Sequence, residues 1–197
     1  NKEANNVIDE SKEKLLPLID EQIKDIENKL KLVQETIQNH NNDLTINDLN
    51  HVECMVTEAN DKCSLVKKNL DNIKIKVDNE VKHLNIYRTI HVTNSIGNIA
   101  QGANAIHTMY KLGDALSCAS DRFKIATFAV SAVFTGIAAA TIAAGCITHK
   151  KIEELQKIGI QCEELRTKIV KYEKDIVQLK QYFQRSSNQN DSSVSMN

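Results

Sequence analysis

The side chains best suited to chemistry in this sequence are five cysteines and six histidines. His51 and Cys54 are three residues apart, so on a helix they would share a face, as pairs of zinc ligands can. Cys63 lies nine residues beyond Cys54, which is about 13.5 Å along the same helix. At that distance it can neither join the same coordination sphere nor form a disulfide with Cys54. We therefore expect no metal site.

The other cysteines bear on folding rather than on catalysis. An odd number of thiols at irregular spacing is not a disulfide framework. Cys118 and Cys146 lie on either side of an uncharged segment, and they would be about 42 Å apart if that segment were one straight helix. A Cys118–Cys146 disulfide is therefore a candidate only if the segment folds back as a hairpin. Cys63 and Cys162 fall in apolar helical repeats, which favours small buried side chains.

Enzymatic motifs are absent from the sequence. It contains no glycine-rich phosphate loop, no nucleophile elbow and no His-Glu zinc motif of the H-E-x-x-H type on a helix. The carboxylate pairs Glu153-Glu154 and Glu163-Glu164 lie outside the apolar repeat, on what would be a solvated helix face. The sequence predicts a protein that is not an enzyme, with no catalytic residues, no cofactor and no small-molecule substrate.

Three ring side chains, His83, Tyr87 and His91, fall close to one stripe of a predicted helix. Protonation of such histidines near pH 6 would loosen helix packing, which makes an acid trigger one hypothesis. Solvated histidines on a helix surface give the same pattern, and the sequence does not distinguish the two.

The overall composition favours helices and disfavours nucleic-acid binding. The 25 basic and 26 acidic residues nearly cancel, so no basic surface is expected. One proline, no tryptophan and 4% aromatic residues indicate helices packed through Ile, Leu, Val and Ala. The chain begins with Asn1 rather than Met, so we expect that upstream sequence has been removed or left out. Whether this was a signal peptide stays open, as does a secreted or cytoplasmic location.

Two heptad repeats predict an antiparallel helical hairpin in residues 1–85. Apolar residues alternate spacings of three and four along helices at about 5–39 and 46–84. Those of the first helix are Leu16, Ile19, Ile23, Ile26, Leu30, Val33 and Ile37. Those of the second are Leu49, Val52, Val56, Ala59, Cys63, Val66, Leu70, Ile73 and Val77, before a slip to Val81 and Leu84. Thr45 and Asp48 have the spacing of a capping box where the second helix begins.

Residues 86–185 predict a different kind of helix pair around an apolar segment. A small-residue helix at about 86–117 carries a stripe of Val92, Ile96, Ile99, Ala103, Ile106, Tyr110 and Gly113. A C-terminal coiled-coil helix carries Leu155, Ile158, Cys162, Leu165, Ile169, Tyr172, Ile176, Leu179 and Phe183. Residues 186–197 are rich in Ser and Asn, which predicts a disordered tail. We predict an all-α fold, an elongated bundle of antiparallel coiled-coil helices with one apolar Ala/Gly-rich helix or helical hairpin.

The apolar segment, residues 125–148, holds 24 residues without a charge, eight of them Ala and none Leu. As one helix it would reach about 36 Å, enough to cross a hydrocarbon core of about 30 Å. Basic residues flank it at Arg122 and Lys124 and again from His149 to Lys151. Because Ala, Ser, Thr and Gly add little to insertion, the segment is only marginally hydrophobic. The apolar segment is therefore compatible with either a bilayer or a protein interior.

Two faces of this segment are candidate sites. Large apolar residues predict a membrane-inserting set, namely Ile125, Phe128, Val133, Phe134, Ile137, Ile142 and Ile147. Small residues recur every four positions and predict a close helix–helix packing face, namely Ala132, Gly136, Ala140 and Ala144. Gly136 also permits a fold-back of the segment into two short helices.

The order of these segments resembles apolipoprotein L-type proteins. The resemblance covers about residues 86–183 and rests on the small-residue helix (Ile96-Gly97 to Gly113), the Ala/Gly-rich stretch from Ile125 to Thr148, and His149-Lys150-Lys151-Ile152-Glu153-Glu154-Leu155 opening the last helix. In architecture alone the chain is also similar to α-helical pore-forming toxins. The resemblance implies lipid association and ion-conducting pores.

These observations lead to a hypothesis of a membrane-active protein. We expect a soluble form that binds or conditionally inserts into lipid bilayers through residues 125–148 and forms pores by oligomerisation. The expected partners are a lipid membrane and either further copies of the chain or partner helices. The alternatives are a coiled-coil interaction protein with a buried apolar helix, and a permanently anchored tether.

Overall fold

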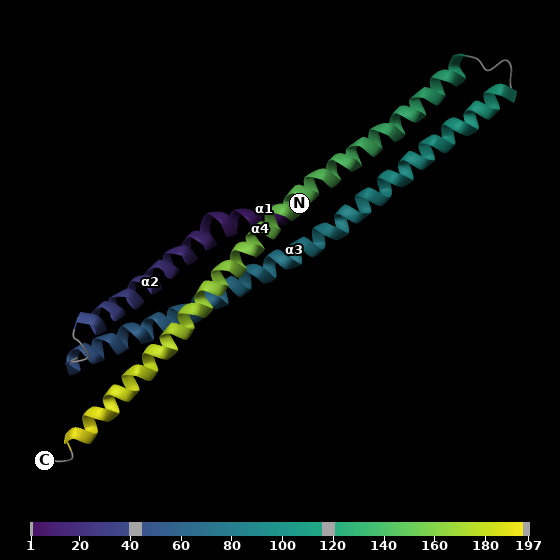
Figure 1. Ribbon diagram of the computed structural model, residues 1–197. Helices are drawn as coiled ribbons and strands as arrows, with labels where there is room; N and C mark the ends of the chain where they lie inside the picture. The colour runs from purple at the N-terminus through teal and green to yellow at the C-terminus, as the bar shows by residue number, and fades with distance from the viewer. Residues whose placement is uncertain (1, 40–44, 116–120, 195–197) are drawn as a thin grey trace. The chain divides into compact units, whose positions relative to one another are not determined.

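The computed structural model describes residues 2–39, 45–115 and 121–194, and all of these are helical except Thr45. The helices in chain order are α1 (Lys2–Glu10), the π-helical turn η1 (Ser11–Leu15), α2 (Leu16–Asn39), α3 (Ile46–Ala115) and α4 (Asp121–Val194) (Figure 1). No strand occurs among the described residues, which confirms the all-α prediction for this part of the chain.

Pro17 explains the π-helical turn near the N-terminus. Proline has no backbone N–H, and its ring clashes with the carbonyl group four residues earlier. The turn immediately before it widens, so that the backbone N–H of Leu16 donates to the carbonyl of Ser11. The chain is therefore helical from Lys2 through Asn39, with the irregularity confined to η1.

The long helices run through boundaries that the sequence predicts. Helix α3 passes residue 86 without interruption, and α4 joins the apolar segment to the C-terminal coiled-coil helix. Gly136 does not break α4, since one glycine costs a helix only about 1 kcal/mol. Residues 125–148 thus form part of one continuous helix rather than a helical hairpin. Helix α4 continues to Val194, into residues predicted to be a disordered tail.

Contacts divide the chain into two compact units, each assembled from segments far apart in sequence. Unit 1 comprises residues 1–5 and 78–156, and unit 2 comprises residues 6–77 and 157–197. Both long helices therefore contribute to both units. The boundary in α3 follows Val77 directly, where the apolar repeat slips.

Unit 2 is a three-helix bundle built from the predicted heptad repeats. In Figure 1, α2 lies beside the first part of α3. The core contains large apolar side chains from all three helices, among them Ile19, Ile23, Ile26, Val33, Val52, Val56, Leu70, Ile73, Ile158, Ile169 and Ile176. These are repeat positions, so the predicted repeats are the buried faces. Helices α2 and α4 each run antiparallel to α3.

Ion pairs between the helices of unit 2 follow this antiparallel order. Lys62 of α3 pairs with Asp25 of α2, and Lys29, one turn further along α2, pairs with Glu58, one turn back along α3. Lys67 of α3 pairs with Glu173 of α4 at 3.1 Å. All these side chains lie at least partly in solvent, so each pair contributes little to the free energy of folding and mainly favours the register.

The predicted capping box at the start of α3 is confirmed. The backbone N–H of Thr45 donates to the Asp48 carboxylate at 3.1 Å, and the backbone N–H of Asp48 donates to Thr45 Oγ1 at 3.3 Å. The Leu49 N–H completes the first turn by donating to the Thr45 carbonyl at 3.0 Å.

Candidate membrane-binding surface

Part of unit 1 packs α3 against α4 through small side chains. We call residues 85–107 of α3 and 129–148 of α4 the small-residue hairpin. Among its described side chains, the buried ones are Ser95 and Gly102 on α3, and Ala138 and Thr148 on α4. Figure 1 shows the two helices side by side and running in opposite directions. No large aliphatic side chain is buried among its described residues, in contrast to the core of unit 2.

Hydroxyl groups join the two helices of this hairpin. Ser95 Oγ and Thr141 Oγ1 are 2.5 Å apart, and either can be the donor. The other hydroxyl then donates to a carbonyl of its own helix, since Ser95 reaches the His91 carbonyl at 2.8 Å and Thr141 reaches that of Ile137 at 3.0 Å. This pair therefore needs no water to satisfy its hydrogen bonds.

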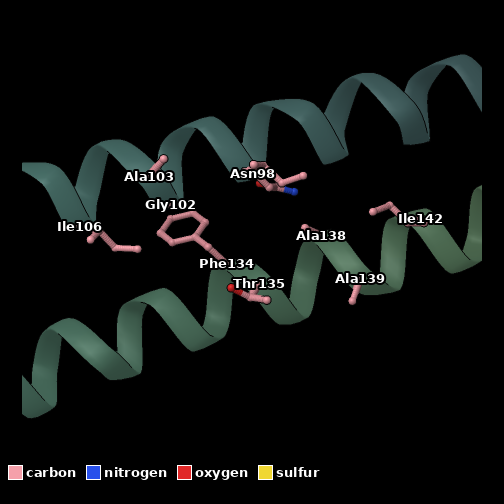
Figure 2. Close-up of a pocket in the computed structure, with 10 residues that line it drawn as sticks. Asn98, Gly102, Ala103, Ile106, Phe134, Thr135, Ala138, Ala139 and Ile142 are labelled. Atoms are coloured by element: carbon pink, nitrogen blue, oxygen red, sulfur yellow. The ribbon is translucent and has the colours of Figure 1, made fainter.

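Phe134 is directed at α3 rather than away from it. A Cβ atom added at Gly102 would lie 3.2 Å from Phe134 Cβ, so glycine provides the close approach at this point. Figure 2 shows the Phe134 ring between the two helices. Beside it is an open groove of about 440 Å³, with a mostly apolar lining that includes Ile99, Ala103, Ile106, Phe134, Ala139 and Ile142.

The large apolar residues that the sequence predicts to insert into a membrane are mostly exposed. Val133 is 60% exposed, Ile137 44%, Ile142 52% and Ile147 54%. Phe134 differs because it is partly covered at the contact with α3. The side chains of Ile125 and Phe128 lie outside the described ones.

The predicted small-residue packing face is not the face that contacts α3. Ala132, Gly136 and Ala140 are exposed, and Ala144 is half-buried. A Cβ atom at Gly136 would meet nothing within 4 Å. This face therefore remains open to a further helix or to lipid.

Helix α3 carries a second exposed apolar stripe, which we did not assign to the membrane site from the sequence. We call Val92, Ile96, Ile99, Ala103 and Ile106 the α3 stripe. Its four large members are 42–63% exposed, and Ala103 is exposed as well. A signal was present in the sequence, because residues 89–110 contain no Asp, Glu, Lys or Arg. At roughly 33 Å this stretch is nearly as long as the apolar segment of α4.

Two of the cysteines, Cys63 and Cys162, are buried as the sequence predicts. Cys63 and Cys162 are free thiols buried in unit 2, and burial raises the pKa of both thiols to about 11. Cys146 is free and exposed on α4. Its predicted disulfide partner, Cys118, lies outside the described residues.

The side chains singled out for other chemistry lie on open helix surfaces. His83 and Tyr87 meet edge to face with ring centroids 5.1 Å apart, and Tyr87 stacks on His91 at 6.5 Å, so the three predicted to share a stripe do so. His51 and Cys54 are exposed on α3. Among the described residues, no three His, Cys, Asp or Glu side chains gather where a metal ion could bind.

One helix among the described residues is long and apolar enough to cross a membrane, by length and composition. It is the part of α4 from Ala132 to Phe183, in which an 18-residue window has a mean hydropathy of 1.5. Only 11% of that window is buried, whereas the central helix of a soluble bundle would be mostly covered. Comparison of the chain with protein-family models, curated proteins and solved structures finds no match.

Proposed function

We propose that the protein is a non-enzymatic, membrane-active helical protein that inserts the small-residue hairpin into lipid bilayers. The observation that carries the proposal is the distribution of side chains in that hairpin. Small and hydroxyl-bearing residues form the contact between the helices, and large aliphatic residues such as Ile96 and Ile137 face outward. This is the reverse of the arrangement in unit 2.

Such a distribution matches the physics of helix packing in lipid. Because lipid chains are as apolar as leucine, helices in a bilayer associate through close backbone contact and hydrogen bonds rather than through burial of large side chains. The contact of Gly102 with Phe134 is a close approach of the first kind, and the Ser95–Thr141 hydroxyl pair is a hydrogen bond of the second kind. In water, the outward-facing isoleucines bury little apolar surface in the contact between α3 and α4.

The composition of residues 125–148 supports insertion that depends on conditions rather than a permanent anchor. Ile, Val and Phe each favour insertion by only a few tenths of a kcal/mol, and the eight alanines contribute little. Basic residues at both ends of the segment would attract anionic headgroups. Assembly of several hairpins through the open face at Gly136 would produce the pores implied by the resemblance to apolipoprotein L-type proteins.

A charge placed on the exposed face tests insertion without disturbing the fold in water. Ile137→Lys changes a side chain that is already exposed, so the expected effect on the free energy of unfolding in buffer is within about 0.5 kcal/mol. At the centre of an inserted helix, the same change opposes insertion by about 3 kcal/mol, which is roughly a hundredfold in partitioning. Ile160→Lys is the matched control, because Ile160 is 59% exposed on the same helix in unit 2.

The measurement is dye release from, and flotation with, vesicles of phosphatidylcholine and phosphatidylserine. We expect the wild type and Ile160→Lys to float with vesicles and release dye, and Ile137→Lys to do neither. Gly136→Leu, which has open space around it in the folded chain, should float but release less dye if the small-residue face assembles pores. If the wild type neither floats nor releases dye, the membrane proposal fails and the chain is a coiled-coil scaffold.

A further inference from the structure

The α3 stripe repeats the spacing by which α3 forms its core in unit 2. Its members are separated by four, three, four and three residues, as in the heptad repeat that ends at Val77. In unit 2 that repeat is covered by α2 and α4, whereas in unit 1 the stripe is exposed to solvent among the described residues. Three of its members, Ile99, Ala103 and Ile106, line one wall of the open groove, and α4 supplies the other wall. Ala103 and Ile106 are labelled in Figure 2.

The surroundings of the stripe permit contact with an identical surface. Because residues 89–110 carry no Asp, Glu, Lys or Arg, two copies of this stretch meet without repulsion between like charges. A helix from a different protein would need no such neutrality, and charges flanking the stripe would be the usual source of specificity. The neutral flanks therefore favour self-association.

The order of side chains along the stripe fits an antiparallel copy of itself. If two copies cross at Ile99, Val92 of one lies opposite Ile106 of the other, since both are seven residues from Ile99. Ile96, three residues before the crossing point, then lies opposite Ala103, four residues after it. A large side chain thus faces a small one, as close packing of two helices requires.

We propose that the α3 stripe is a dimer interface, in which α3 of a second copy lies antiparallel in the groove of unit 1 and crosses at Ile99. Each copy thereby supplies a further helix beside the small-residue hairpin, with Ile96 directed at Ala103 of the partner. This proposal goes beyond membrane insertion, because it concerns the chain in aqueous buffer without lipid and can be true whether or not vesicles are bound.

Cysteine cross-linking tests both the surface and the direction of the partner helix. The exposed cysteines Cys54 and Cys146, and also Cys118, are first replaced by serine. Single Ile99→Cys and single Val92→Cys variants of this chain are then oxidised in buffer. At an antiparallel crossing the two Ile99→Cys thiols meet, whereas two Val92→Cys thiols are about 21 Å apart along the helix axis. We expect covalent dimers from Ile99→Cys alone, and from Val92→Cys only when it is mixed with Ile106→Cys.

Light scattering gives an independent measure. The wild type should have twice the chain mass of 22.1 kDa. Ile99→Glu, which brings two carboxylates together at the crossing point, should reduce this to the single mass. The control Ile90→Glu changes a similarly exposed residue of α3 outside the stripe and should remain dimeric. A wild-type monomer overturns the proposal, and so does cross-linking of Val92→Cys alone as efficient as that of Ile99→Cys, since that indicates a parallel pair.

Discussion

At the scale of single residues, the small-residue hairpin of unit 1 depends on contacts that are small and polar. The hydroxyl groups of Ser95 and Thr141 connect α3 to α4 where unit 2 uses aliphatic side chains. Each hydroxyl also has a carbonyl of its own helix within reach, so losing its partner leaves it with an acceptor. The contact therefore adds modestly to stability while favouring one register between the helices.

Thr141→Val tests this contact by removing the hydroxyl group with little change of shape. We expect a loss of about 1 kcal/mol in the free energy of unfolding, the usual contribution of one hydrogen bond. Thr167→Val is the control, because the Thr167 hydroxyl donates to the Glu163 carbonyl of its own helix on an exposed surface. Urea denaturation, with a double-mutant cycle that includes Ser95→Ala, measures the coupling. A cycle that closes without coupling energy, or an equal loss in Thr167→Val, contradicts the assignment.

At the scale of helices, α2 is held in unit 2 by burial of its apolar repeat and by ion pairs along its edge. The hydrogen bond from Lys62 holds the pKa of the Asp25 carboxyl below its usual value, despite some opposition from burial. The hydrogen bond from Lys29 similarly lowers the pKa of the Glu58 carboxyl. The ionised form of both side chains is therefore more stable in the folded state than in the unfolded chain.

This shift gives the packing of α2 a dependence on pH. Because the pKa of Asp25 is lower in the folded state, its stabilising effect is complete above the ordinary Asp pKa of about 4 and disappears as the pH falls through the lowered value. We expect Asp25→Asn to be less stable than the wild type at pH 6, and the difference to shrink as the pH falls below the ordinary Asp pKa. Urea midpoints measured across this range check the prediction. Asp20→Asn, which removes a pair with Lys24 on α2 itself, should show a smaller change.

At the scale of the whole molecule, the two units differ in how much they bury. Unit 2 has a continuous core of Ile, Leu and Val from three helices, whereas the small-residue hairpin of unit 1 buries small side chains from two. Regions that bury few apolar contacts open at lower free energy than the core. Helix α4, which contributes to both units, should therefore not be equally stable along its length.

Hydrogen–deuterium exchange read by mass spectrometry tests this difference. We expect amides in residues 157–176 to exchange much more slowly than amides in residues 129–148, although all belong to the same helix. Adding vesicles should slow exchange in 129–148 and leave 157–176 unchanged if the hairpin inserts. Uniform protection along α4 in buffer would contradict the proposed difference between the units.

The spacing of apolar residues was sufficient to predict the helices and the buried faces of unit 2. A strict three-four repeat of Ile, Leu and Val defines one apolar side of a helix, and that side is buried wherever a partner helix is present. The cap at Thr45 was also predictable, because a capping box is contained in four consecutive residues. The apolar character of residues 125–148 also follows from composition.

Only the tertiary structure decided which side of α3 and α4 is buried in unit 1. From the sequence, the small-residue face with Gly136 was the candidate for a helix contact, yet α3 and α4 meet through Ser95, Gly102 and Ala138 instead. Small and hydroxyl-bearing residues have no strong preference for a buried or an exposed position. Their direction is set by the antiparallel register of two long helices, which is a property of pairs of residues far apart in sequence.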